Sequence, residues 1–350
     1  MSAARDVFAV PSGRVTLAHG GGGRAMRELI EGVLLPAFGN TLLAPLEDQA
    51  RISMTELVGL GDRLAFTTDT YVVSPIEFPG GDIGRLAVFG TVNDLAMAGA
   101  KPLYLSCGLV LEEGLEMSVL ARVAESMGRA AREAGVKIVT GDTKVVERGA
   151  ADRIFINTAG VGVVPWGPQI SVSRARPGDV LILNGSLGDH GVAILIARNQ
   201  LALEAEIGSD SQPLHGLVAA MLTVCPDIHC LRDTTRGGLA TVLSEFATAS
   251  RVGIWVREAA LPINEIVRGA CEILGLDPLY LANEGKLAAI VPRAAAEAVL
   301  AAMRAHPAGR EAAIVGEVTA EPAGSVILST AFGGDRIVDM LAGEQLPRIC

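Results

Sequence analysis

Residues 136–144 read VKIVTGDTK, an apolar run that gives way at once to small polar and charged side chains. The run 136–140 predicts a buried strand, and 141–144 predicts the polar loop that follows it. Just upstream, residues 103–111 predict another strand and residues 117–134 predict a helix that ends at a glycine. A strand, a helix and a strand in succession indicate a mixed fold, α/β or α+β, although they do not fix the strand order.

The alternation of strands and helices continues on both sides of this stretch. Two segments rich in proline and glycine, 165–168 and 176–179, interrupt it, and we place a domain boundary near residue 168. We therefore expect an N-terminal domain over 1–168, a C-terminal domain over 169–342 and a tail over 343–350. The remaining predicted strands are 62–69, 154–164, 180–184, 253–256, 287–291 and 313–318, and the remaining predicted helices are 24–37, 83–98, 192–198, 214–222, 238–250, 263–274 and 294–305.

The composition argues against several classes of protein. Hydrophobic residues make up 50% of the 350 residues but aromatic residues only 4%, so we expect a large core of aliphatic side chains. A net charge of −10 without long runs of lysine and arginine argues against a surface for nucleic acid or anionic membranes. Because neither a membrane-spanning stretch nor a secretory signal is visible, we expect a cytoplasmic protein.

The five cysteines include no CxxC pair, which argues against a disulfide framework or a zinc knuckle. Cys350, the last residue, stands apart from the other four, because structural cysteines are least expected at an exposed chain end. A thiolate is a strong nucleophile that can carry an acyl-type group. On the residues alone, a carrier thiol and a chance terminal cysteine both stay open. The other four are interpreted as ordinary thiols: Cys107, Cys225, Cys230 and Cys271.

Acidic residues recur where predicted apolar strands end, as at Asp69 and Asp142. Mg²⁺ takes hard oxygen ligands together with substrate phosphates, and ligands of open α/β sheets gather at strand ends. These residues therefore suggest a site for a nucleotide with Mg²⁺, whereas the structural alternative is that each one caps a turn or helix. Further acidic or amide candidates lie in loops or helices: Asp48, Asn93, Asp94 and Asp233.

Neither common phosphate-binding motif is present, since GxxxxGK[ST] is absent and no GxGxxG opens a helix after a strand. The glycine run 20–23, with Gly21 and Gly22, can present backbone N–H groups to phosphates as a lid or can be a flexible loop. Residues 236–238 precede a predicted helix whose N-terminus favours anions, although Asp233 to Thr235 can equally cap that helix. Lys144 and Glu284 are candidate bases, with a surface lysine and a turn glutamate as the structural alternatives.

Longer segments carry a resemblance that covers the chain nearly end to end. In order they are LAHGGGG, EDQAR, LAFTTDTYVVSP, FPGGDIGRLAVFGTVNDLAMAGA, YLSCGLVLEEGL, IVTGDTKVV, GAADRIFINTAG, LGDHG, LRDTTRGG, ANEGKL and PRIC. With them the chain resembles the HypE family of hydrogenase maturation proteins, the carbamoyl dehydratases. The resemblance implies the two-domain PurM-like fold of the aminoimidazole-ribonucleotide-synthetase superfamily, in which N-terminal domains of a homodimer form a β-barrel with ATP near the interface.

The resemblance also implies a reaction. A HypF carbamoyltransferase would load a carbamoyl group onto Cys350, and ATP would activate its oxygen, leaving a thiocyanate whose cyanide passes to iron on a HypC–HypD complex. Lys144 and Glu284 would handle the protons, and the tail would be flexible enough to swing Cys350 between the two steps. Mg²⁺ ligands would be Asp69, Asp94 and Asp142, and the wider ATP site would include Asp48, Asn93, Thr143, Asp233, Gly21 and Gly22.

Two rival functions fit the same fold. A selenophosphate-synthetase-like enzyme would carry a reactive cysteine or selenocysteine and a lysine in the N-terminal glycine loop, whereas this loop reads His19-Gly-Gly-Gly-Gly-Arg24 and Cys107 is the first cysteine. A non-enzymatic maturation scaffold would use ATP only to order the fold. Because fold does not determine function, release of phosphate by a carbamoylated protein is what would separate a scaffold from an enzyme.

Overall fold

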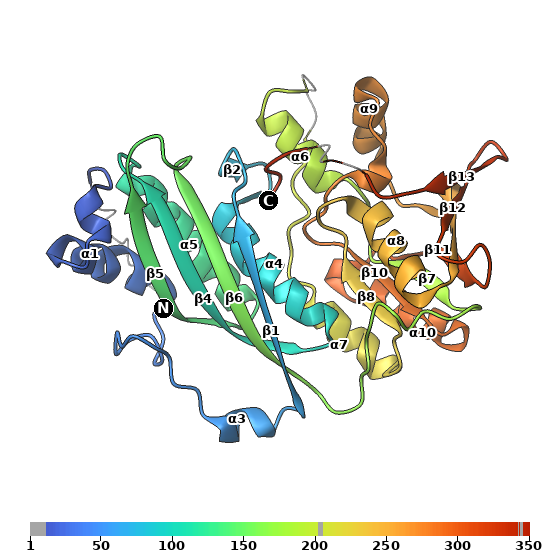
Figure 1. Cartoon of the computed structure of the whole chain (residues 1–350), viewed down its shortest axis with the longest axis horizontal. Helices are drawn as coiled ribbons and strands as arrows, with labels where there is room; N and C mark the ends of the chain where they lie inside the picture. The colour runs from blue at the N-terminus through green and yellow to red at the C-terminus, as the bar shows by residue number, and fades with distance from the viewer. Residues whose placement is uncertain (1–11, 202–205, 342, 344–345) are drawn as a thin grey trace, which may run out of the picture.

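The computed structural model describes residues 12–201, 206–341, 343 and 346–350. The chain forms two β-sheets side by side, with helix α4 (Ile83–Met97) at their junction (Figure 1). The C-terminus lies at the same junction, near α6 (Asp189–Ala197). Within the described ranges, no helix combines the length and the apolar character needed to cross a membrane. The expectation about a secretory signal concerns residues 1–11, which lie outside those ranges.

The first sheet has the strand order β1-β6-β4-β5, with β4 and β5 parallel and the other pairs antiparallel. Helices α4 and α5 (Met117–Glu133) cover one face. Side chains alternate along β1, so Tyr71 is buried on that face while Leu64 and Phe66, on the outer face, are 57% and 72% exposed. The strands are β1 (Arg63–Tyr71), β4 (Lys101–Glu112), β5 (Lys137–Val146) and β6 (Ile154–Val164).

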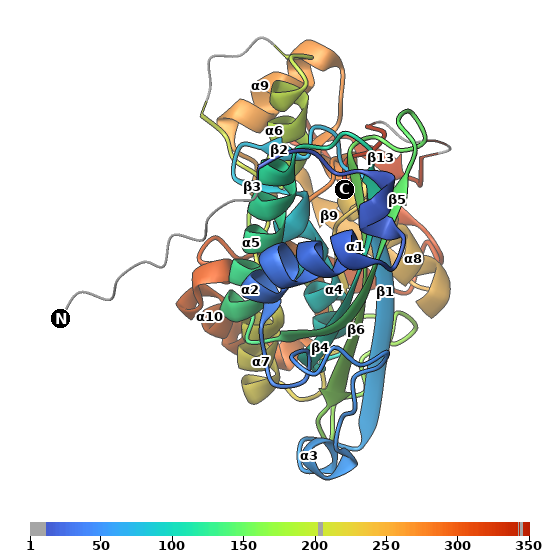
Figure 2. The same cartoon turned by 90° about the vertical axis from the view of Figure 1, so that its left-hand side faces the viewer.

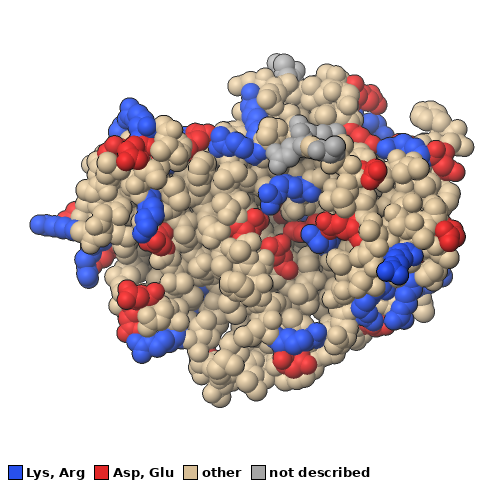
Figure 3. All heavy atoms as spheres, in the orientation of Figure 1, with Lys and Arg blue, Asp and Glu red and all other residues tan. Residues whose placement is uncertain are grey.

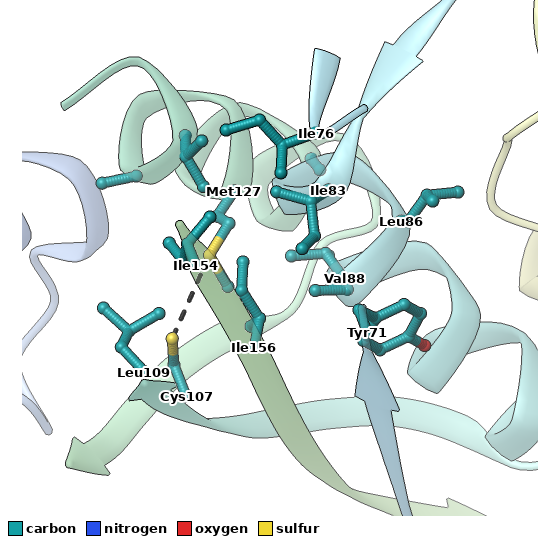
Figure 4. Close-up of a cluster of buried hydrophobic side chains, with 14 of the residues drawn as sticks. Tyr71, Ile76, Ile83, Leu86, Val88, Cys107, Leu109, Met127, Ile154 and Ile156 are labelled. Carbon is teal, nitrogen blue, oxygen red and sulfur yellow. Dashed lines mark hydrogen bonds between the residues drawn. The ribbon is translucent and has the colours of Figure 1, made fainter. Parts of the chain in front are cut away.

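Aliphatic side chains fill the space between this sheet and its helices, as the low aromatic content predicts. Ile83 and Val88 of α4 and Ile154 and Ile156 of β6 are at most 1% exposed (Figure 4). The Cys107 thiol lies 4.0 Å from the Met127 sulfur, and burial raises the pKa of this thiol to about 12. Cys107 therefore packs as an apolar side chain and is no nucleophile.

Helix α4 positions the functional residues of both halves. The Asp82 carboxylate caps its start by accepting hydrogen bonds from the backbone N–H groups of Gly84 and Arg85. The helix is buried nearly all round because it packs on β1, β6 and α5 of the first half and on α7 and β8 of the second. Side chains on its two faces, including those of Asn93 and Asp94, therefore reach the junction.

The N-terminal helices α1 (Arg24–Leu29) and α2 (Leu35–Phe38), joined by a π-helical turn (Ile30–Leu34), pack on α5 near the edge strand β5 (Figure 2). They begin after the glycine run, in which Gly20 approaches β5 closely. A Cβ at Gly20 would lie 2.6 Å from the backbone nitrogen of Val145, so only glycine fits there. A short helix, α3 (Met54–Val58), precedes β1, and the strands β2 (Glu77–Phe78) and β3 (Gly81–Asp82) form a small ribbon before α4.

The second sheet has the order β13-β12-β9-β11-β7-β10-β8, which places β8 at the edge facing α4. Its strands are β7 (Val180–Leu183), β8 (Cys230–Asp233), β9 (Gly253–Arg257), β10 (Leu287–Val291), β11 (Ala313–Thr319), β12 (Val326–Ser329) and β13 (Asp335–Val338). Its helices, besides α6, are α7 (His215–Val224), α8 (Gly238–Ser250), α9 (Glu265–Leu274) and α10 (Ala296–Ala305).

Several predicted elements differ from the structure. Residues 141–144 are not a loop but part of β5, because hydrogen bonding to the parallel strand β4 continues to Val146. Asp69 likewise lies inside β1 rather than after it. Strands β8, β12 and β13 are too short, at four residues each, for a clear pattern. Helix α8 is preceded by Gly237 without a side-chain cap, so Asp233 does not cap it.

Candidate active site

Cys350 is buried, contrary to the prediction of an exposed chain end. It is 8% exposed, and its carbonyl oxygen accepts a hydrogen bond of 3.0 Å from the backbone nitrogen of Val72, just after β1. The thiol-bearing residue borders a cavity of 460 Å³ together with Thr70, Arg236 and Ala282. The other four cysteines are buried as well, in agreement with their interpretation as ordinary thiols.

Carboxylates from both halves gather near this cavity. Asp94 of α4 accepts a hydrogen bond of 2.8 Å from the Thr67 hydroxyl, and Asp69 lies 3.6 Å from the guanidinium of Arg236, which precedes α8. Asp233, at the end of β8, belongs to the same group, because the charges of Asp94 and Asp69 act on it. Figure 3, drawn in the orientation of Figure 1, shows acidic side chains near the middle of the molecule with basic side chains beside them.

The carboxylates of this group destabilise one another's charge. Burial, opposed by the Thr67 hydrogen bond and reinforced by the charge of Asp69, raises the pKa of Asp94. Burial and then the charge of Asp94 raise the pKa of Asp233 to about 7. Carboxyl groups in this state gain from a bound cation, which restores the ionised form.

Glu284, predicted as a base or a turn residue, is 3% exposed and lies just before β10. Burial, and then the charges of Asp210, Asp233 and Asp69, raise the pKa of Glu284 well above its ordinary value. One carboxylate oxygen, Oε1, is buried without a hydrogen-bond partner among the described residues. A buried, unsatisfied carboxylate of raised pKa is typical of a catalytic base, and Glu284 follows Ala282, which lines the cavity of Cys350, by two residues.

Asp142 and Lys144 lie on β5, at the opposite edge of the first sheet from β1 and Asp69. Three strand spacings, about 14 Å, separate their edge strand β5 from β1. By register, both side chains point to the outer face of the sheet, whereas Asp69 points to the helix-covered face. They pair with each other at 2.8 Å and are 61% and 63% exposed. One copy of the chain therefore does not bring Asp69, Asp94 and Asp142 together, and the described residues contain no group of three or more His, Cys, Asp or Glu side chains placed to hold a metal ion.

A second cavity, of 320 Å³, separates the N-terminal helices from β5. Aliphatic side chains such as Met26 and Ile30 form one wall, while Gly22, Asp142 and Thr143 supply polar groups. An apolar pocket with a few polar groups and a glycine loop at one side can accept a flat base with phosphates attached. Glu47 also borders it, and its neighbour Asp48 is exposed. Gly21 follows the short 3₁₀ helix Leu17–Gly20 beside the cavity.

Three residues near the site were not predicted from the sequence: Asp210, Lys286 and Tyr71. Asp210 accepts hydrogen bonds from the backbone nitrogens of Glu284 and Gly285, and Lys286 pairs with its carboxylate at 3.2 Å. Tyr71 is buried, and its pKa is raised by burial and then by the charges of Asp69 and Glu284. Asn93, predicted as a nucleotide ligand, instead uses both functional groups of its side chain to join the halves, by bonds to Gln212, Leu214 and Glu284.

The two halves match a known pair of domains. The domain described as "AIR synthase related protein, N-terminal domain" matches residues 47–164, and the corresponding C-terminal domain matches residues 176–329. The fold and the junctional site therefore define an AIR synthase related protein.

Closer relatives narrow this class. The carbamoyl dehydratase HypE of Azotobacter vinelandii is 58% identical over 97% of this chain and 98% of its own length. A crystal structure of the maturation protein HypE in complex with ATP superposes with a TM-score of 0.90, at 54% identity over 95% of this chain and 99% of that one. A HypE–HypF complex gives a TM-score of 0.78, at 47% identity over 89% of this chain and 99% of that one. The chain belongs to the HypE family of carbamoyl dehydratases.

Proposed function

We propose that this protein dehydrates an S-carbamoyl group on Cys350 to a thiocyanate at the expense of ATP, and so supplies cyanide for the metal centre of a [NiFe]-hydrogenase. The observation that carries the proposal is the position of Cys350, which borders a cavity at the domain junction rather than extending into solvent. Ala282, two residues before Glu284, lines the same cavity, so the segment that carries the candidate base borders the space beside the thiol.

The chemistry needs an activated oxygen and a base. In Cys350–S–C(=O)–NH₂ the carbonyl oxygen attacks the terminal phosphorus of ATP, and ADP leaves. The C–O bond then breaks, phosphate departs with the oxygen, and the nitrogen loses two protons as the C≡N bond forms. Glu284 is suited to accept one proton, because its raised pKa makes its ionised form a stronger base than an ordinary glutamate.

The acidic group would hold Mg²⁺ only together with further ligands, because the described residues of one copy are not placed to hold a metal ion by themselves. Asp69, Asp94 and Asp233 supply hard oxygen ligands, and the raised pKa values of Asp94 and Asp233 show that their charges lack compensation in the protein alone. When bound, Mg²⁺ would neutralise phosphate charge. In this proposal the three carboxylates would help to hold the ion near the cavity of Cys350, and Arg236 adds a positive charge beside them.

We further infer that the complete site includes a second copy of the chain. Lys144 and Asp142 lie on the outer face of the first sheet, and Thr70, on that same face, lines the cavity of Cys350. The exposed Leu64 and Phe66 make this face apolar, which favours packing against another sheet. Two such faces pressed together as a β-barrel would bring Lys144 and Asp142 of one copy toward Glu284 and Cys350 of the other.

This arrangement divides the chain by role. Residues 1–168 would bind ATP and form the dimer, residues 169–342 would supply Glu284 and Asp233, and residues 343–350 would carry the thiol. The cavity with Gly22, Asp142 and Thr143 would take the nucleotide, as the ATP-bound relative supports. A HypF carbamoyltransferase would load Cys350, as the HypE–HypF complex supports, and a HypC–HypD complex in the cytoplasm would receive the cyanide.

Mass spectrometry of the C-terminal peptide tests this function. The protein is incubated with a HypF carbamoyltransferase, carbamoyl phosphate, ATP and Mg²⁺, with Cys350→Ala as the control. We expect an adduct of one carbamoyl group on Cys350 that then loses the mass of one water, only with hydrolysable ATP. An unmodified Cys350 beside an active transferase would refute the carrier role, and a stable carbamoyl adduct without phosphate release would indicate a scaffold.

A further inference from the structure

Two backbone hydrogen bonds join the last residues of the chain to the segment that follows β1. The backbone nitrogens of Val72 and Ser74 donate to the carbonyl oxygens of Cys350 and Arg348, at 3.0 and 3.3 Å. These two bonds form a short antiparallel pairing between the tail and residues 72–74, which follow β1. Two backbone bonds alone would leave such a short segment frayed. Burial of Ile349 and Cys350, which are 4% and 8% exposed in the core of the first half, stabilises the docked end, and side chains of the second half add polar contacts to it.

Arg198, directly after α6, is one of these side chains. Its Nε donates to the carbonyl oxygen of Ser74 at 2.7 Å, and its Nη2 donates to the carbonyl oxygen of Arg348 at 2.7 Å. One half-buried guanidinium therefore joins both sides of the short pairing. Bonds from a charged donor are stronger than neutral ones, and the fork of the guanidinium fixes the spacing of the two carbonyl groups.

His190, in the first turn of α6, is the second. Its Nε2 must donate to the carbonyl oxygen of Ile349, 2.8 Å away, because a carbonyl can only accept. The neutral ring then accepts the Ser209 hydroxyl at Nδ1, also at 2.8 Å. His190 is 0% exposed, and the ring of Phe78 packs edge-on against it at 5.6 Å. These two contacts fix the orientation of the ring and do not involve the tail.

The docked tail also contains strain. Arg348 has a φ of 53°, a left-handed conformation that is unfavourable for a residue with a side chain. Its own side chain offsets part of this cost, since Nε donates to the carbonyl oxygen of Val72 at 2.9 Å and Nη1 pairs with Asp152 at 2.7 Å. A strained segment held by many polar contacts has two separate states, docked and released, rather than a continuum.

We propose that His190 and Arg198 are positioning residues that clamp the carbonyl groups of Arg348 and Ile349 in the tail beside that of Ser74, and thereby set the fraction of time for which Cys350 is docked. Both lie in or beside α6, a helix of the second half, while the tail pairs with the first half. The fraction of docked Cys350 therefore depends on the relative position of the two halves. Its consequence for catalysis depends on the proposed function, because only a docked Cys350 can meet Glu284.

Alkylation of Cys350 measures the released fraction without ATP or any carbamoyl group. The full-length protein is treated with iodoacetamide at neutral pH, and modification of each cysteine is followed by peptide mass spectrometry. We expect His190→Gln to raise the rate at Cys350 about fivefold, for loss of a neutral hydrogen bond, and Arg198→Gln about a hundredfold, for loss of two hydrogen bonds from a charged donor. Arg129→Gln, which removes the same charge from an exposed ion pair on α5, should leave the rate unchanged.

The other cysteines distinguish a clamp from general destabilisation. Cys225 and Cys230 are buried in clusters that contain no described residue of the tail, so their rates should not change in the clamp variants. An unchanged rate at Cys350, or a parallel rise at all cysteines, would overturn the proposal. Should His190→Gln fail to fold, Ser209→Ala, which removes the hydrogen bond that orients the His190 ring, is a gentler test of the same clamp. In a carbamoylated protein, Arg198→Gln should lower the rate of dehydration while loading by the transferase is retained, and Arg198→Lys should restore part of it.

Discussion

The side-chain amide of Asn93 donates a hydrogen bond of 3.3 Å to the main-chain carbonyl of Glu284, so that helix α4 of the first half holds the candidate base of the second. The same amide donates to Gln212 at 3.1 Å, and its oxygen accepts from the backbone nitrogen of Leu214 at 2.8 Å. Asn93 is 1% exposed, so water does not compete for these bonds. Asn93 therefore links the two halves directly beside the candidate base.

Replacing Asn93 by alanine should destabilise the protein by about 2–4 kcal/mol, because three buried backbone groups lose their partner. Denaturant unfolding measures this loss. Asn157→Ala is a matched control, since Asn157 also makes three hydrogen bonds but is exposed on the outer face of the sheet. It should cost about 1 kcal/mol or less, and equal losses in the two variants would contradict the assignment.

Glu284→Gln should lower the single-turnover rate of dehydration about 10²–10⁴-fold and leave loading of Cys350 intact, because glutamine keeps the shape but cannot take a proton. In the unmodified protein the rate should rise with pH above the range where a glutamate ordinarily ionises, since burial and neighbouring carboxylates raise the pKa of Glu284. Rapid quench with mass spectrometry follows the step. Glu125→Gln, on the exposed face of α5, should behave as the unmodified protein, and a fully active Glu284→Gln would exclude a base at this position.

Asp233→Asn should stabilise the protein at pH 8 but not at pH 4. The pKa of Asp233 is raised to about 7 in the fold, so the folded state keeps its proton while the unfolded state loses it near pH 4. Stability from this group is therefore complete in acid and is lost as the pH rises to about 7, by about 4 kcal/mol. Thermal melting at both pH values tests the difference. A gain that is equal at pH 4 and pH 8 would show that burial of charge is not its cause.

Gly90→Ala should be strongly destabilising, because a Cβ at this position of α4 would lie 2.1 Å from the hydroxyl of Tyr71. Tyr71→Phe removes that hydroxyl and should cost little alone, since the oxygen is buried without a hydrogen-bond partner among the described residues. The double variant should therefore be more stable than the sum of the single effects predicts, by about 1–3 kcal/mol. Additive effects in denaturant unfolding would mean that the helix shifts away instead of meeting the ring.

Long periodic elements could be predicted from the sequence, but the assembly of the site could not. The strand 154–164 and the helix 238–250 were predicted with the bounds that the structure shows, because each has a clear pattern and a polar or glycine boundary. The burial of Glu284 and Cys350 had no local signal, since it arises where the tail pairs with the chain just after β1 and where the loop before β10 meets Asn93 of α4. Asp142 illustrates the same limit: its sequence context matches that of Asp69, but strand order and register place the two on opposite faces of the sheet.

That separation leads to a test of the composite site. Lys144→Ala and Glu284→Gln should each abolish dehydration, and refolding an equal mixture of the two variants should restore about a quarter of the unmodified activity. If Lys144 acts on the Glu284 of the partner copy, half of the sites in a mixed dimer combine an intact Lys144 with an intact Glu284, and half of all dimers are mixed. If the two residues act within one chain, every site in the mixture lacks one of them and no activity returns. The geometry favours restoration, because about 14 Å of sheet separates β5 from β1 within one copy, whereas the outer face that carries Lys144 continues to Thr70 at the cavity of Cys350.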